Sequence, residues 1–240
     1  VEYGTTKQIT HTPEAERGVS FGADNRSLVY SSERGGKRDL YIAKISRKED
    51  LNFPNATLIE EEPLVPSKTL ERDYPQFSPD GKEVAFIEDR NRLMVVNLAT
   101  KQIRQVTDGS TWYNTGGGFD YEWSPDGKWF TLEFTGNKHD PYSDIGLVSA
   151  EGGKDIINLT NSGYMSGYPH FALDGNAILF TTERYGMRAH ASWGSLNDAM
   201  LVFLNQDAYD KYCLSKEDYE LRKELEKDPG YVMDVLRQGT

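Results

Sequence analysis

The sequence predicts an all-β protein, and three recurring features indicate this fold class. Four aspartates in turn-forming contexts follow one another at intervals of 56, 46 and 48 residues. An aromatic residue stands three positions before each aspartate, and apolar residues stand four and six positions after it. A fixed pattern at such a period is typical of repeat architectures and predicts the blades of a β-propeller. The four aspartates are Asp24, Asp80, Asp126 and Asp174.

Each repeat begins with a strand that ends in a tight turn. Ser-Pro-Asp-Gly occurs letter for letter at residues 78–81 and 124–127. Proline sets φ at the second position of such a turn, and glycine accepts the positive φ that closes it. Asp24-Asn25 and Asp174-Gly175 are weaker versions of the same turn, since asparagine is the next-best residue after glycine for positive φ.

The second strand follows the turn, with positions four and six after the aspartate on one face. Position five is small or aliphatic in every repeat, so we expect neighbouring blades to cover both faces; these residues are Val29, Ala85, Thr131 and Leu179. Four strands per repeat match a propeller blade. Third strands are expected at 40–45, 93–98, 145–148 and 200–204, and fourth strands at 57–59, 103–107 and 156–160.

The two ends of the repeat array are ragged. Lys7–Thr10 has the pattern of a fourth strand without its first three, and the last repeat has no obvious fourth strand. Either this segment completes the last blade of a four-bladed ring, or the array belongs to a larger propeller. Four blades are the small limit of the usual range. We therefore expect residues 1–206 to form about four blades of a larger propeller.

Residues 207–240 differ in character, because the alternating pattern stops there. The segment 214–227 predicts a helix with a narrow apolar stripe and a wide charged face. Ser215 is the expected N-cap, and Pro229-Gly230 would end the helix. We interpret this part as a helical insertion or linker that leads to further sequence.

An arginine stands ten positions after the aspartate in three repeats, at Arg34, Arg90 and Arg184. An acidic residue precedes each of them, and such a pair can clamp a ligand. Recurrence in three blades favours a structural role instead. We expect each arginine to bond acids or carbonyl oxygens of a neighbouring blade.

The composition excludes some classes of function. With 27 basic and 38 acidic residues, the net charge is −11, which argues against nucleic-acid binding. No stretch reaches the roughly 18 apolar residues of a membrane span. The chain opens on Val1 and shows no signal peptide, which trimming would also explain. We expect a periplasmic or secreted protein, with the cytoplasm as the alternative location.

Few residues offer chemistry. The single cysteine, Cys213, has no histidine near it in sequence, so an inert thiol is the better interpretation. His170 should lie near the central channel, where a packed residue is a more common role than a ligand. Asp120 and Glu122 are a pair of carboxylates beside a first strand, as a glycosidase or lyase would need.

Other motifs are weaker still. His139, Asp140 and Asp144 share a long loop that lacks the acidic spacing of a calcium site. No Gly-x-Ser-x-Gly elbow occurs, and the glycine run 116–118 has no strand-then-helix context. We therefore predict no catalytic, cofactor-binding or metal-binding residue in this chain, and no cofactor.

The Ser-Pro-Asp-Gly blades, with Asp39-Leu40-Tyr41 opening a third strand, resemble the TolB-type propeller repeat over residues 18 to 205. A narrower stretch is similar to the propeller region of tricorn-type serine peptidases of Bacteroidetes-like bacteria. This second resemblance implies downstream PDZ and peptidase domains that hold the catalytic residues. It also implies that the propeller admits peptides. The stretch comprises 183–195, 202–212 and 214–220.

Two functions follow from these resemblances. The first is a non-catalytic propeller segment of a tricorn-like serine protease, which serves substrate gating or protein interaction. The alternative is a stand-alone periplasmic TolB-like propeller that binds a protein partner. A third possibility, an independent propeller enzyme, requires carboxylates that converge on the channel.

Overall fold

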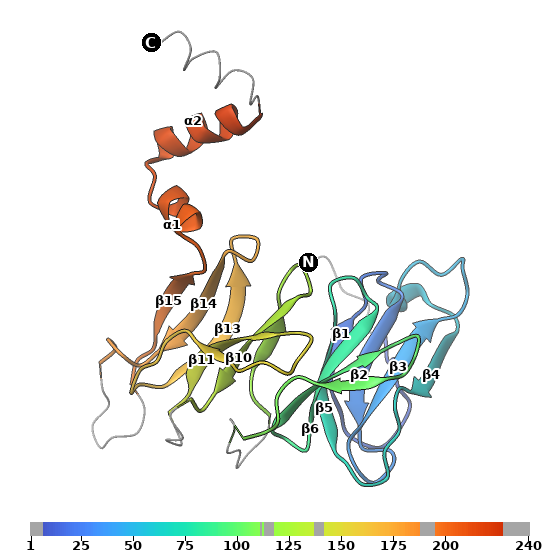
Figure 1. The fold of residues 1–240 in the computed structure, drawn as a ribbon. Coiled ribbons are helices and arrows are strands. Elements are labelled where there is room, and N and C mark those ends of the chain that lie inside the picture. Colours follow the sequence, from blue (N-terminus) through green and yellow to red (C-terminus); the bar gives the residue numbers. More distant parts are fainter. Residues whose placement is uncertain (1–6, 111, 113–117, 137–141, 188–194, 228–240) are drawn as a thin grey trace, which may run out of the picture.

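The fold is all-β with a helical end, as the sequence predicts. The computed structural model describes residues 7–110, 112, 118–136, 142–187 and 195–227. Within them lie four antiparallel sheets, of which three have four strands and the last has three. The four sheets are numbered blades 1 to 4 in chain order. Figure 1 shows them following one another, with blades 1 and 4 at opposite ends of the row and the helices beyond blade 4.

Blades 1 and 2 each contain four strands in sequential order. Blade 1 consists of β1 (Glu16–Phe21), β2 (Ser27–Ser32), β3 (Asp39–Ile45) and β4 (Ile59–Pro63), with the short 3₁₀ helix η1 (Phe53–Asn55) between the last two. Blade 2 consists of β5 (Arg72–Phe77), β6 (Glu83–Glu88), β7 (Arg92–Asn97) and β8 (Ile103–Gln105).

Blades 3 and 4 repeat this order, and two helices follow. Blade 3 consists of β9 (Tyr121–Trp123), β10 (Trp129–Phe134), β11 (Asp144–Ser149) and β12 (Ile157–Asn158). Blade 4 consists of β13 (Ser166–Ala172), β14 (Ala177–Thr182) and β15 (Asp198–Phe203). The helices are α1 (Gln206–Tyr212) and α2 (Lys216–Lys227).

The predicted turns connect the first and second strands. Asp80 accepts hydrogen bonds from the Ser78 hydroxyl at 2.7 Å and from the backbone N–H of Lys82 at 3.1 Å. These bonds, led by the one from Ser78, lower the pKa of the Asp80 carboxyl to about 2. Gly81 has φ 70°, a conformation that glycine adopts without steric cost. The turn chemistry read from the sequence is therefore confirmed.

In blades 2 to 4, the side chains four and six positions after the turn aspartate pack on the preceding blade. Val84 and Phe86 share a cluster with Val29 and Leu40 of blade 1. Phe130 and Leu132 share one with residues of blade 2, and Ile178 and Phe180 share one with Ile145 of blade 3. The core thus consists of layers between blades, each formed by apolar faces that exclude water from one another.

The N-terminal segment departs from expectation. Residues 7–10 form no strand and do not complete the last blade. Ile9 instead packs against the core of blade 1, and the Lys7 ammonium donates to the carbonyl oxygen of Ala56. Burial of Ile9 there prevails over the weak strand propensity of four residues. The fourth strand of blade 1 also lies later than expected, at Ile59–Pro63 instead of 57–59.

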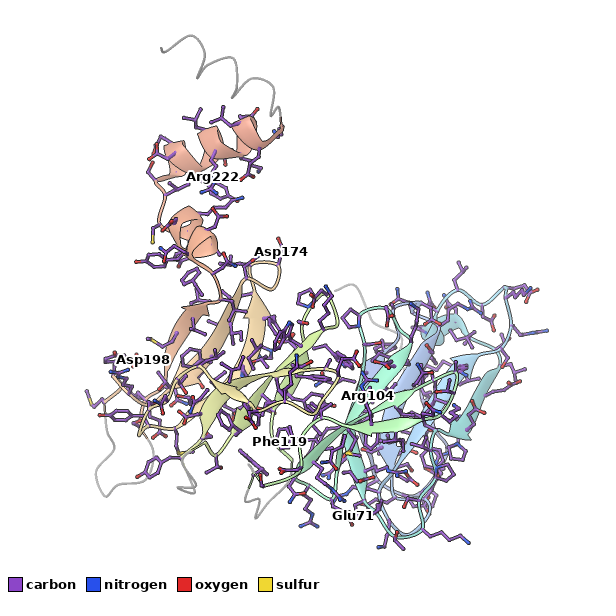
Figure 2. All side chains as sticks on the ribbon, viewed as in Figure 1. Glu71, Arg104, Phe119, Asp174, Asp198 and Arg222 are labelled. Carbon is purple, nitrogen blue, oxygen red and sulfur yellow. The ribbon has the colours of Figure 1, made fainter. Side chains whose placement is uncertain are left out.

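The predicted helix is present as α2. Its start is capped as expected, because the backbone N–H of Asp218 donates to the Ser215 hydroxyl at 3.1 Å. A second helix, α1, was not predicted separately; Asn205 caps it by accepting from the Ala208 N–H at 2.8 Å. Arg222 lies on the side of α2 that faces α1 and bonds Asp207 there at 2.6 Å (Figure 2).

Candidate functional site on the first strands

The first strands of successive blades lie side by side and form a groove of about 480 Å³. Val19 and Ser20 of β1 line one wall, and residues 74–77 of β5 form the floor. Glu122 and Trp123 of β9 line the other wall. Val19 is 59% exposed, so an apolar side chain faces solvent beside the groove.

Three of the four first strands contain a β-bulge at the same place. The pairing with the second strand shifts between Arg17 and Ser20, between Asp73 and Gln76, and between Gly167 and His170. The backbone turns to positive φ within each bulge, at Gly18, Tyr74 and Tyr168. A bulge redirects the side chains that follow it, and here the Ser20 and Gln76 side chains turn toward the next blade.

The residue four positions before the turn aspartate links blades 1, 2 and 3 to the blade that follows. The Ser20 hydroxyl accepts from the Phe77 N–H at 3.2 Å, and the Gln76 amide donates to the Tyr121 carbonyl at 2.9 Å. Glu122 accepts from the Phe171 N–H at 2.8 Å. A hydroxyl, an amide and a carboxylate at this position thus each form a hydrogen bond with a backbone group of the next blade. Without these bonds the backbone groups would lack a partner.

A half-buried carboxyl group lies between blades 3 and 4. Glu133 of β10 accepts a hydrogen bond from the Tyr168 N–H at 2.8 Å. Burial raises the pKa of Glu133 to about 7, and the nearby charge of Asp120 adds to the rise. Burial also raises the pKa of Asp120, while the proximity of His170 opposes that change. The sequence reasoning missed Glu133, although a charged residue in an otherwise apolar second strand was a usable signal.

His170 and Glu122, which the sequence analysis considered separately, are neighbours across blades 3 and 4. The His170 Nδ1 atom lies 3.3 Å from a Glu122 carboxylate oxygen, and the imidazole is 66% exposed. Within the described residues, no serine, threonine or cysteine side chain is recorded at hydrogen-bond distance from this imidazole. The prediction that the chain carries no catalytic residue stays a prediction.

The other candidates are placed as follows. Asp144 accepts hydrogen bonds from Asn158, Thr160 and Ser162 of its own blade, at 2.7 to 3.0 Å. His139, Asp140 and most of the glycine run 116–118 lie outside the described residues. Across the ranges that the structure describes, no group of three or more potential ligands is arranged for a metal ion. Cys213 is an exposed free thiol at the end of α1.

Among the described residues, the ion pairs of Arg34 and Arg90 are made within their own blades, so the expectation of contacts to a neighbouring blade was wrong for these two arginines. Arg34 pairs with Glu16 and Glu61 of its own blade, each at 2.7 Å, and its guanidinium stacks on the Tyr41 ring at 4.3 Å. Arg90 lies 3.6 Å from Glu71, also in blade 2. The arginine ten positions after the turn aspartate lies just past the end of the second strand. Its side chain can therefore reach acidic residues of its own sheet.

Other arginines connect the blades instead. Arg17 of blade 1 pairs with Asp73 of blade 2, and Arg38 lies 3.3 Å from the same carboxylate. Arg104 of blade 2 donates to the carbonyl of Ala150 in blade 3 at 2.9 Å. These contacts join neighbouring blades, and the Asp73 carboxylate that both arginines of blade 1 share is only 11% exposed.

Three comparisons relate this chain to known proteins. No protein-family model matches it. The Tol-Pal system protein TolB of Francisella tularensis subsp. holarctica is 31% identical over 93 residues, which are 37% of this chain and 19% of that protein. The matched segment thus spans about a fifth of its curated relative.

Two solved structures share the fold. TolB from Acinetobacter baumannii aligns with a TM-score of 0.55 and 20% identity, over 80% of this chain and 42% of that chain. The tricorn protease aligns with a TM-score of 0.58 and 14% identity, over 86% of this chain and 20% of that chain. At such identities the likeness concerns the fold alone. The chain therefore has the β-propeller fold that is found in TolB and in the tricorn protease.

Proposed function

We propose that this chain is a non-catalytic propeller segment of a tricorn-like serine protease and that it binds peptide or protein through the groove on its first strands. In this proposal, PDZ and peptidase domains of the same protein carry the chemistry, and the protein is periplasmic or secreted. The groove is the observation that carries the proposal, and the fold shared with the tricorn protease supports it.

The groove suits an extended peptide. Val19 and Phe77 offer apolar contact, and the Glu122 carboxylate offers a hydrogen-bond acceptor beside them. Clefts that combine apolar walls with a few polar groups are the usual sites for small ligands and peptide side chains. Most backbone groups at the floor are already paired between blades, so we expect side-chain contacts to dominate the affinity.

A binding assay with matched variants tests this proposal. The probe is a pool of fluorescein-labelled tryptic casein peptides, followed by fluorescence anisotropy. Val19→Glu should weaken binding about tenfold, because it places a charge in the apolar wall. Leu221→Glu on α2 is the control, since Leu221 is also 59% exposed and lies away from the groove. Equal binding by both variants, or peptide cleavage by the chain itself, would contradict the proposal.

The alternative is a stand-alone periplasmic TolB-like propeller that binds a protein partner. The match to a Tol-Pal system protein favours it. The native reading frame discriminates the two functions. A stop codon soon after Thr240 supports the binding module, whereas several hundred further codons with PDZ-like and peptidase patterns support the protease.

A further inference from the structure

The groove on the first strands has an uneven charge. Among the described residues that line it, Glu122 alone has a charged side chain, and the others are apolar, aromatic or neutral. No lysine or arginine of the described ranges lines the groove to offset this charge. The chain as a whole has a net charge of −11. A ligand that complements this groove therefore has a positive charge, because a negative ligand would be repelled.

The Glu122 carboxylate has one oxygen to offer to such a ligand. Both of its recorded hydrogen bonds are made by Oε2, which accepts from the Phe171 N–H at 2.8 Å and lies 3.3 Å from the His170 Nδ1 atom. Within the described part of the chain, Oε1 has no recorded partner. The side chain is 38% exposed. The carboxylate is thus fixed through one oxygen and accessible at the other.

The backbone around Glu122 holds the carboxylate in place. The next residue of β9, Trp123, is 6% exposed, and its ring packs on Phe130 at a centroid distance of 4.1 Å. The bond to the Phe171 N–H ties the Glu122 side chain to blade 4. A group that is fixed before the ligand arrives loses little conformational entropy on binding. Glu122 is therefore suited to bind a ligand group at a defined position.

The protein already contains one guanidinium that contacts both a carboxylate and an aromatic ring. The Arg17 guanidinium lies 5.2 Å from the centroid of the Tyr74 ring, and it donates to both oxygens of the Asp73 carboxylate. Such a pair of contacts is favourable for a guanidinium, because the ring face attracts its charge and the carboxylate accepts its N–H groups. The groove contains the same two elements, since aromatic side chains and the Glu122 carboxylate border one cavity.

The neighbouring charges favour a cation as well. Arg17 lies beside the groove, but the Asp73 carboxylate that it binds is only 11% exposed and compensates its charge. Two further carboxyl groups, those of Asp120 and Glu133, lie close enough to each other at the boundary between blades 3 and 4 for their charges to interact. The local potential at the Glu122 end of the groove is therefore negative, apart from a charge that His170 would add when protonated.

We propose that the groove binds peptides in which an arginine lies between apolar residues, and that the Glu122 carboxylate binds the guanidinium. This inference rests on the proposed function, since it names the class of peptide that the groove takes. The guanidinium donates to Oε1 of Glu122, and the apolar neighbours of the arginine contact Val19 and Phe77. Arginine suits this site better than lysine, because its planar group can contact a ring and a carboxylate together.

Two matched peptides test this proposal by isothermal titration calorimetry. The first is Ala-Ala-Val-Arg-Val-Ala-Ala with both ends blocked, and the second has citrulline in place of arginine. Citrulline has nearly the same shape as arginine but no charge. The unaltered chain should bind the arginine peptide about tenfold more tightly than the citrulline peptide, as a charge-assisted hydrogen bond with some ring contact would give.

Glu122→Gln separates the charge of this residue from its structural role. Glutamine keeps an oxygen that accepts from the Phe171 N–H, so the contact with blade 4 remains. The variant should reduce the preference for the arginine peptide to less than about threefold and leave the affinity for the citrulline peptide unchanged. The matched control is Glu60→Gln, which removes an exposed charge on β4 and should keep the preference at about tenfold.

The salt dependence of the unaltered chain is a second measurement that needs no variant. Raising the concentration of sodium chloride from about 50 mM to about 500 mM should lower the preference for the arginine peptide, because salt screens a partly exposed charge. If Glu122→Gln does not fold, this measurement decides. A preference that is independent of salt would then overturn the proposal.

Val19→Glu distinguishes failure of this inference from failure of the proposed function. It should weaken the citrulline peptide about tenfold, because this uncharged peptide depends on the apolar wall. If Val19→Glu has this effect but both peptides bind the unaltered chain equally, the groove binds peptides and the role of Glu122 is overturned. A preference that persists in Glu122→Gln overturns it too. If neither peptide binds, or if Val19→Glu changes the affinity for neither, the proposed function fails and this inference fails with it.

Discussion

Glu133→Gln should make the protein more stable at pH 8 while leaving it almost unchanged at pH 4. Glu133 lies between blades 3 and 4, and burial raises the pKa of its carboxyl to about 7 from an ordinary value of 4.5. Between pH 4.5 and 7 the carboxyl is therefore mostly protonated and neutral in the folded chain. In the unfolded chain the same carboxyl is already ionised in this range. Glutamine keeps the shape and the acceptor for the Tyr168 N–H without the charge.

The magnitude follows from linkage between protonation and folding. Between pH 4.5 and 7 the folded protein binds more protons at this site than the unfolded chain, so stability falls as pH rises through this window. A shift of this size corresponds to about 3 kcal/mol. Because the side chain keeps some solvent contact, we expect Glu133→Gln to recover about 2 kcal/mol at pH 8.

Urea unfolding at pH 4 and at pH 8 measures this difference, with the free energy of unfolding extrapolated to water. The control is Glu60→Gln on β4, where the side chain is exposed; it should change stability by less than about 0.5 kcal/mol at either pH. If Glu133→Gln and the unaltered chain lose the same stability from pH 4 to pH 8, the argument from burial is refuted.

Two further predictions concern backbone space and a shielded charge. Gly152 and Gly153 have similar positive φ values, but a Cβ at Gly152 would lie 2.2 Å from the carbonyl oxygen of Gln105 in blade 2, whereas one at Gly153 meets nothing within 4 Å. In urea unfolding, Gly153→Ala should lower the free energy of unfolding by about 1 kcal/mol. Gly152→Ala should lower it by at least about 2 kcal/mol more. Equal losses for the two variants would argue against close packing at Gly152. Arg34→Met should cost about 3 kcal/mol in the same assay, because it leaves two glutamates of its blade unpaired; a loss under about 0.5 kcal/mol would show that solvent screens this network.

The sequence predicted the blades well because their determinants are local. The Ser-Pro-Asp-Gly turn is specified by residues 78–81 themselves, and the apolar face follows from alternation in the next strand. Helix α2 was predicted for the same reason, since Ser215 and the residues after it contain both the cap and the stripe.

Features that depend on contacts between distant residues were missed. The connection between β3 and β4 is one, because nothing near Phe53 in sequence shows that it will pack in one cluster with Leu28 and Tyr30. The ion-pair partners of Arg34 are another such feature. Whether Arg34 pairs with its own blade or with the next one depends on the direction in which its side chain extends from the sheet. Glu133 acquires its raised pKa only when blade 4 packs against it.

Thiol accessibility at the fifth position after each turn aspartate tests the central claim most directly. The four single variants are Val29→Cys, Ala85→Cys, Thr131→Cys and Leu179→Cys, each made together with Cys213→Ser so that one thiol remains. Under native conditions, a small maleimide should label only the variant of blade 4, because successive blades bury the other three positions. Rapid labelling of all four thiols in folded protein, or protection of the blade 4 thiol in the monomer, would contradict the stacked arrangement with one open end.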